Sequence, residues 1–200
     1  MAVSVDQVRE LRDRTGAGVL DSKKALEAHA GDMDAAIQAL REQGLAAAAK
    51  KAGRQAAEGR VVSYIHGNPG RIGVLLELNC ETDFVARTER FERLAMDLAM
   101  QVAAAGPAFV RDDDIPDDIV EAERHTFVAQ MANEGKPPDL LAKIAEGKLA
   151  KWRDQVVLLR QPFIKDADTS VAELVQAAVA ELGENIVVRR FARFEIGEAS

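Results

Sequence analysis

The strongest constraint on the fold is a pair of β-rich segments that are joined by a short turn and followed by a long amphipathic segment. Residues 60–66 (RVVSYIH) and 71–79 (RIGVLLELN) are rich in apolar and β-branched residues, and GNPG separates them. Glycine, asparagine and proline favour turns, so the two segments are predicted to pair as an antiparallel hairpin. Residues 83–105 then repeat apolar side chains at helical spacing, which predicts a helix packed against the hairpin.

The helix over residues 83–105 decides how Phe84 is interpreted. Its predicted buried stripe consists of Phe91, Leu94, Ala95, Leu98 and Val102. Asp83 is a candidate N-cap, because its carboxylate can accept a backbone N–H of the first turn. Phe84 precedes Phe91 by seven positions, which places it within about 20° of the stripe and favours a core position. The first helical turn can also project past the edge of a sheet, so both positions stay open.

Residues 1–44 are predicted to form a compact module of three short helices. The helices are expected at residues 3–14, 19–28 and 33–43. Asp32 is expected to cap the third helix and Gly44 to end it. Residues 45–59 (LAAAAKKAGRQAAEG) consist largely of good helix formers and predict a mostly helical linker.

Residues 60–200 are predicted to form an α+β core domain with a small antiparallel sheet. After the long helix, residues 117–160 indicate a helical hairpin and residues 171–182 a last helix. Residues 185–196 (NIVVRRFARFEI) alternate as a strand does. Because a three-stranded sheet has open edges, a second copy could cover one of them, and the core is also a candidate dimerisation domain.

Charge and composition narrow the classes of partner. The net charge is −7, yet residues 1–60 hold ten Lys and Arg against nine Asp and Glu, so the acidity lies in the remainder of the chain. An acidic body is repelled by phosphate backbones, so we expect no nucleic-acid partner and favour a protein with a positive face. The charged N-terminus and the absence of an 18–20-residue apolar run indicate a cytoplasmic protein with no membrane partner.

No pattern in the sequence predicts an enzyme, a metal site or a bound cofactor. The single cysteine, Cys80, excludes an internal disulfide and a Cys-rich zinc site. In the predicted hairpin Cys80 lies on the order of 25 Å from His66, too far for a nucleophile and its base. Gly16 and Gly18 lack the third glycine of a dinucleotide loop, and the aspartates of residues 112–118 lack the spacing of a calcium loop.

Two long motifs in the chain resemble the bacterial translation elongation factor Ts family. The first is VRELRDRTGAGVLDSKKAL at residues 8–26, and the second is LELNCETDFVAR at residues 76–87. The resemblance covers essentially the whole chain and extends to the GEN sequence at residues 183–185. Only one core half is evident, as in shorter members of the family.

The resemblance implies guanine-nucleotide exchange on elongation factor Tu, without chemical catalysis. It implies that residues 1–44 form a module similar to ubiquitin-associated domains, which docks on the GTPase through Arg12, Val19, Leu20 and Lys23. It also implies that Thr82, Asp83, Phe84 and Val85 intrude beside the magnesium ion of the nucleotide. GDP would then leave, and the factor would hold the nucleotide-free GTPase until GTP enters. Shorter members are expected to form homodimers through the core.

Two departures and one alternative accompany this resemblance. Family members often carry two methionines where this chain has Val19 and Leu20, and a cysteine where it has Ser22. Whether Arg12, Lys23 and Lys51 contact a partner or only water is left open. The alternative function is an adaptor or chaperone that binds through residues 1–44 and needs no special role for Phe84.

Overall fold

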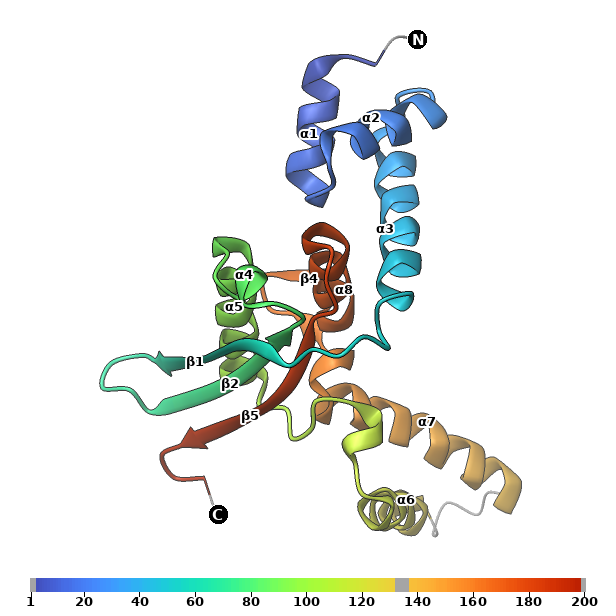
Figure 1. The fold of residues 1–200 in the computed structure, drawn as a ribbon. Helices are drawn as coiled ribbons and strands as arrows, with labels where there is room; N and C mark the ends of the chain where they lie inside the picture. Colours follow the sequence, from blue (N-terminus) through green and yellow to red (C-terminus); the bar gives the residue numbers. More distant parts are fainter. Residues whose placement is uncertain (1–2, 132–136, 199–200) are drawn as a thin grey trace. The chain divides into compact units, whose positions relative to one another are not determined.

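The chain folds as an α+β protein, as predicted (Figure 1). The structure, a computed structural model, describes residues 3–131 and 137–198. In chain order the elements are α1 (Val5–Thr15), α2 (Val19–Ala28), α3 (Met33–Ala49), β1 (Glu58–His66), β2 (Ile72–Cys80), α4 (Asp83–Ala86), α5 (Glu89–Ala105), the 3-10 helix η1 (Asp112–Asp114), α6 (Asp117–Met131), α7 (Pro138–Val156), the 3-10 helix η3 (Leu158–Arg160), β3 (Pro162–Phe163), β4 (Asp166–Ser170), α8 (Val171–Leu182) and β5 (Val187–Glu195).

The first three helices form around a small apolar core, with their ends set by local signals. Ser4 and Gln7 make a capping box at the start of α1, and Gly16 ends α1 with a φ of 71°. Asp32 caps α3, as predicted, by accepting hydrogen bonds from the N–H groups of residues 34 and 35. The buried core of the three helices consists of Val8, Leu11, Leu26 and Ala36.

The third helix does not end at Gly44, so that prediction is wrong. The run LAAAA after Gly44 has a high helix propensity, and α3 continues through it to Ala49. The linker predicted for residues 45–59 is therefore helical only as far as Ala49. The chain then turns, and β1 begins at Glu58.

The hairpin and the last strand form one three-stranded sheet in the order β1-β2-β5, so β2 is central. The side chains of Val74, Leu76, Leu78 and Cys80 are buried, which shows the alternation of a half-buried strand on β2. The sequence did not predict the separate two-stranded sheet of β3 and β4. Strands of two and five residues are too short to show a period, and β4 ends at Ser170, directly before the last helix α8.

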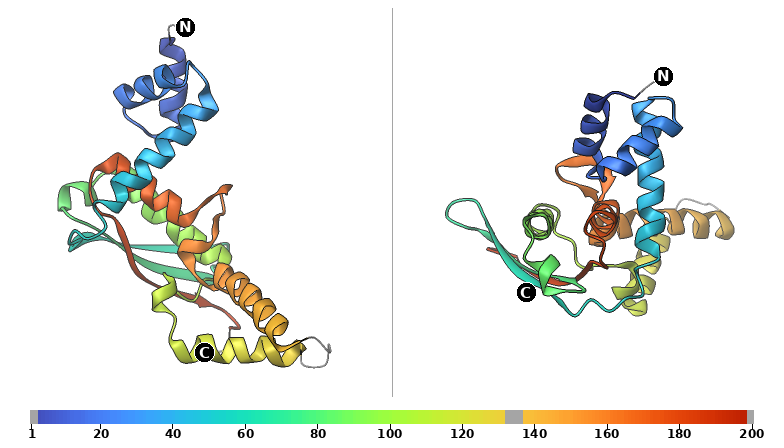
Figure 2. Two further views of the ribbon diagram at one scale, coloured as in Figure 1. Left: turned by 90° about the vertical axis from the view of Figure 1, so that its right-hand side faces the viewer. Right: turned by 45° about the horizontal axis from the view of Figure 1, so that its top comes forward.

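The described residues divide into two compact units, and the sheet strands and α5 contribute to both. Among the described residues, the first unit comprises 3–62, 76–97 and 172–189. Within it, α8 and the first part of α5 lie side by side on one face of the sheet (Figure 2, right). The side chain of Arg90 on α5 donates to a carboxylate oxygen of Glu181 on α8 at 2.7 Å. The stripe predicted for α5 is confirmed, since all five of its side chains are buried.

The second unit comprises residues 63–75, the described residues of 98–171, and residues 190–198, and it contains the predicted helical hairpin. Helices α6 and α7 pack against each other (Figure 2, left). A buried cluster of Ile115, Val120, Leu149 and Val157 lies between them and the adjoining segments. Arg124 of α6 also pairs with Glu146 of α7 at 2.8 Å. The residues that join the two helices lie outside the described part of the chain.

Candidate functional site

Residues 82–85, called the corner below, are the N-cap and the first three residues of the short helix α4, which follows β2. The N-cap of α4 is Thr82 and not Asp83, so the predicted cap is wrong by one residue. The Thr82 hydroxyl accepts a hydrogen bond from the Val85 N–H at 3.4 Å. Asp83 is the first helical residue, and its carboxylate pairs with Arg87 at 2.7 Å on the exposed side of the turn.

The single long helix predicted from residue 83 is wrong, because the chain breaks between α4 and α5. Thr88 produces the break. Its hydroxyl donates to the Val85 carbonyl at 2.8 Å and accepts from the Phe91 N–H at 3.3 Å. A threonine in this arrangement ends one helix and caps the next, so α5 starts afresh at Glu89.

The break places Phe84 outside the core. Its side chain is 80% exposed, whereas Phe91 is fully buried. Seven residues correspond to nearly two full turns only along an uninterrupted helix, and Thr88 interrupts it. The core position favoured by periodicity is therefore wrong, and the corner presents an exposed phenyl ring beside the half-buried Val85.

Glu184, which lies after the end of α8, holds the start of the corner. One carboxylate oxygen accepts from the N–H groups of Glu81 and Thr82, both at 3.0 Å, and the other accepts from the Thr82 hydroxyl at 2.6 Å. Sequence reasoning assigned no role to Glu184. The only signal for it was its place in the GEN sequence, because a contact over about a hundred residues leaves no local pattern.

Asn185 continues this network toward the segment that follows α3. Its backbone N–H donates to the carboxylate of Glu81 at 2.7 Å. Its buried side-chain amide donates to the carbonyls of Ala52 and Arg54 at 3.4 and 2.8 Å. Residues 184 and 185 therefore bond both the start of the corner and the linker that follows α3. Asn185 also had no role in the sequence analysis.

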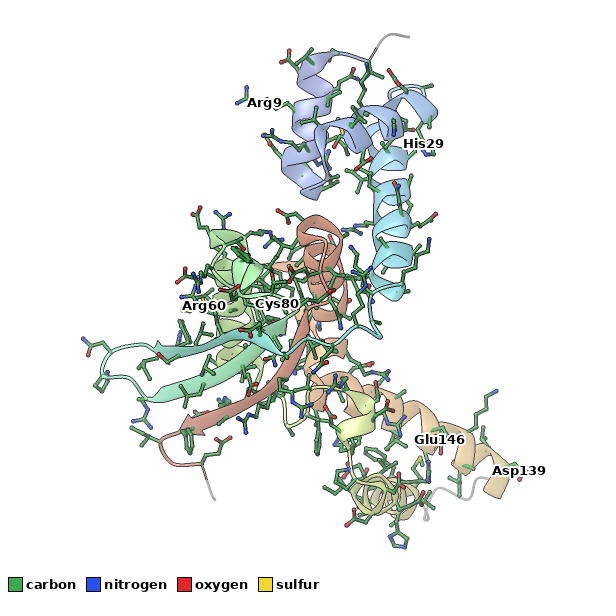
Figure 3. All side chains as sticks on the ribbon, viewed as in Figure 1. Arg9, His29, Arg60, Cys80, Asp139 and Glu146 are labelled. Carbon is green, nitrogen blue, oxygen red and sulfur yellow. The ribbon has the colours of Figure 1, made fainter. Side chains whose placement is uncertain are left out.

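The buried side chain of Cys80 contacts the start of the corner. Cys80 is also unsuited to nucleophilic chemistry. The thiol is fully buried at the end of β2 (Figure 3), and it donates to the Thr82 carbonyl at 3.1 Å. Burial, together with the nearby charge of Glu184, raises the pKa of Cys80 to about 11. A thiol with this pKa stays protonated near neutral pH, and the protonated form is a poor nucleophile.

The four residues predicted to dock on the partner, called the docking set below, lie on α1 and α2. Val19 and Leu20 open α2 and are 57% and 66% exposed. Lys23 lies one turn further along and pairs loosely with Glu27 at 3.7 Å. Arg12 lies near the end of α1 and bonds its neighbour Asp13 at 2.9 Å. The docking set and the corner both belong to the first unit.

The described residues contain no group of three or more His, Cys, Asp or Glu side chains that could hold a metal ion. Among the helices in this part of the chain, none has the length and apolar character needed to cross a membrane. The site presents exposed apolar side chains, Phe84 at the corner and Val19 and Leu20 in the docking set, and long-range hydrogen bonds hold the corner.

Comparisons with known proteins agree with the two motifs. A sequence model of the family described as "Elongation factor TS" matches residues 20–198. The chain is 56% identical over 196 residues to elongation factor Ts of Carboxydothermus hydrogenoformans, covering 98% of this chain and 90% of the relative. It is 53% identical over 198 residues to that of Herpetosiphon aurantiacus, covering 98% and 99%. It is 50% identical over 198 residues to that of Thermodesulfovibrio yellowstonii, covering 99% and 98%. The three relatives match the chain through both the docking set and the corner, whereas the family model begins at Leu20, after Arg12 and Val19. The chain belongs to the elongation factor Ts family.

Proposed function

We propose that this chain is a guanine-nucleotide exchange factor for elongation factor Tu in translation elongation. The observation that carries the proposal is the exposed ring of Phe84, which is 80% exposed in a corner held by long-range hydrogen bonds. A large apolar side chain in solvent costs free energy unless a partner covers it. Membership of the elongation factor Ts family supports the choice of partner.

The proposed mechanism is displacement of the magnesium ion that accompanies bound GDP on the partner. The ion bridges phosphate oxygens and GTPase side chains, so it accounts for much of the nucleotide's affinity. Phe84 acts as a wedge that moves the elements supporting the ion, and Asp83 and Val85 flank it. No covalent bond forms or breaks, so the factor accelerates exchange by binding alone.

Exchange also requires that the factor bind the nucleotide-free GTPase more tightly than the loaded one. A ligand shifts an equilibrium only by its differential affinity for the two states. In this proposal the corner supplies the difference, because its wedge fits only when the ion has moved. GTP then enters, restores the magnesium site and releases the factor.

The docking set supplies the remaining affinity. Val19 and Leu20 are exposed apolar side chains with charged neighbours, as in a protein-binding surface. Arg12 and Lys23 are candidate polar contacts at the edge of the surface formed by Val19 and Leu20. Both are more than 40% exposed, and within the described part of the chain they pair with residues of their own helices, so a partner could recruit them at little cost.

We further propose that the chain forms a homodimer through the sheet of its core. The sheet has two edge strands, β1 and β5. In the second unit, Ile65 and Leu75 lie on the face of the hairpin opposite the buried residues of β2, and Phe194 on β5 is 70% exposed. Sedimentation equilibrium at micromolar concentration tests this assembly. A dimer is expected, and a monomer alone would contradict it.

The exchange function is tested by the release of fluorescent GDP from purified elongation factor Tu. The wild-type chain should accelerate release, and Phe84→Ala should lower the rate at saturating factor about 30-fold, the effect of losing a central hot spot. Leu140→Ala is the matched control, because it removes an exposed apolar side chain from α7, far along the chain from both candidate sites. Equal rates for Phe84→Ala and the wild type would refute the wedge.

A further inference from the structure

We propose that Glu184 is a positioning residue for exchange, which fixes the orientation in which the corner presents Phe84. This inference rests on the proposed function and extends it to a residue that does not itself need to touch the partner. Its basis is the convergence of three donors from Glu81 and Thr82 on one carboxylate.

The corner needs such a support because α4 is only four residues long. A single helical turn does not persist by itself in water, since nucleating a helix costs more than its first hydrogen bond returns. At its end, α4 is held by Thr88, whose hydroxyl bonds the Val85 carbonyl. At its start, the side chain of Glu184 holds the N-cap residue Thr82 by both its N–H and its hydroxyl. The orientation of Phe84 is therefore set from both sides.

The hydrogen bonds between residues 81–82 and residues 184–185 run in both directions, so they are satisfied together in one geometry. The carboxylate of Glu184 accepts from the backbone of residues 81 and 82, while the carboxylate of Glu81 accepts from the backbone N–H of Asn185 at 2.7 Å. Gly183, with a φ of 79°, turns the chain at the end of α8 and places Glu184 for this contact. Charge-assisted hydrogen bonds are shorter and stronger than neutral ones, so this clasp resists reorientation of the corner.

The test measures the rate of GDP release from elongation factor Tu against the concentration of the factor. The plateau rate reports displacement, and the half-saturating concentration reports docking. For Glu184→Ala, which removes all three hydrogen bonds, we expect the plateau to fall about tenfold, because the start of α4 then loses its support. The half-saturating concentration should change by less than about twofold. Glu184→Gln keeps acceptor capacity for the two N–H groups, so it should restore part of the plateau.

Glu92→Ala is the matched control, because it removes an ion-paired carboxylate from the same unit without touching the corner. Its plateau should equal that of the wild type. The decisive comparison is Glu184→Ala made in the Phe84→Ala background. If Glu184 acts through Phe84, the second substitution adds no further loss. An equal loss in both backgrounds, or an unchanged plateau for Glu184→Ala alone, would overturn the inference.

Hydrogen exchange at the N–H groups of residues 81, 82 and 85 separates failure of the inference from failure of the proposed function. Wild-type chain that does not accelerate GDP release at all refutes the function. Faster exchange at these groups in Glu184→Ala than in Glu92→Ala supports the positioning role in either case. Equal exchange in the two variants overturns that role.

Discussion

The docking set and the corner both present apolar side chains to solvent, but they are held in different ways. Leu20 is 66% exposed and Phe84 is 80% exposed. The helices that carry the docking set are fixed by residues close by in sequence, such as the capping box of Ser4 and Gln7. The corner is fixed by Glu184, which lies 102 and 103 residues away from the residues that it bonds.

This difference separates a surface held by contacts close in sequence from a surface held by contacts between segments about a hundred residues apart. The helices that carry the docking set enclose a small core of their own. The corner needs the end of α8 beside the end of β2, so its geometry forms only when the first unit is complete. A partner that engages both surfaces thus contacts one that is locally encoded and one that depends on long-range packing.

Among the substitutions that test this comparison, Asn185→Ala is expected to change the free energy of unfolding most. The substitution leaves the carbonyls of Ala52 and Arg54 without their buried donor, and the free energy of unfolding should fall by about 3 kcal/mol. Urea unfolding followed by circular dichroism measures it. The control is Gln7→Ala, which removes an exposed local cap partner and should cost far less. Equal losses of unfolding free energy in the two variants would show that the long-range hydrogen bonds of Asn185 stabilise the fold no more than a local cap does.

A smaller effect is expected from the titration of Cys80. Its pKa is raised from 9.0 to about 11, so the protonated thiol favours the folded state. This stabilisation is complete below pH 9 and is lost as the pH rises toward 11. Over that range the wild type should lose about 2 kcal/mol more free energy of unfolding than Cys80→Ala. Urea unfolding at several pH values tests this, and parallel pH profiles for the two proteins would argue against it.

The smallest effect is expected for Ser4→Ala, which acts only on the local side of the comparison. Loss of the capping box should cost about 1 kcal/mol in the first three helices. Thermal unfolding should register this cost, while the plateau rate of GDP release stays at the wild-type value. A fall in the plateau rate would mean that the first three helices influence the corner, although, among the described residues, no part of the capping box bonds it.

Local signals made much of the fold predictable. The hairpin, the buried stripe of α5, the Asp32 cap and the helices of the first module follow from periodicity, caps and turn residues. The end of α3 was misplaced because an alanine-rich run outweighed the glycine before it. The sheet of β3 and β4 was missed because strands of two and five residues show no period.

The corner shows where such reasoning fails. Periodicity placed Phe84 in the core because Thr88 was treated as an ordinary helical residue, whereas its hydroxyl ends one helix and starts another. The family resemblance gave Phe84 its proposed role but gave none to Glu184 or Asn185. Their contacts join segments about a hundred residues apart, and a single sequence carries no spacing rule for such pairs.

In the proposed mechanism the corner drives displacement, while the docking set supplies affinity. One experiment tests it most directly, the rate of GDP release from elongation factor Tu against factor concentration for Phe84→Ala and Leu20→Ala. Phe84→Ala should lower the plateau rate about 30-fold, and Leu20→Ala should raise the half-saturating concentration about tenfold at an unchanged plateau. A curve for Phe84→Ala that reaches the wild-type plateau at higher concentration would contradict the claim, because it would make Phe84 one more docking contact.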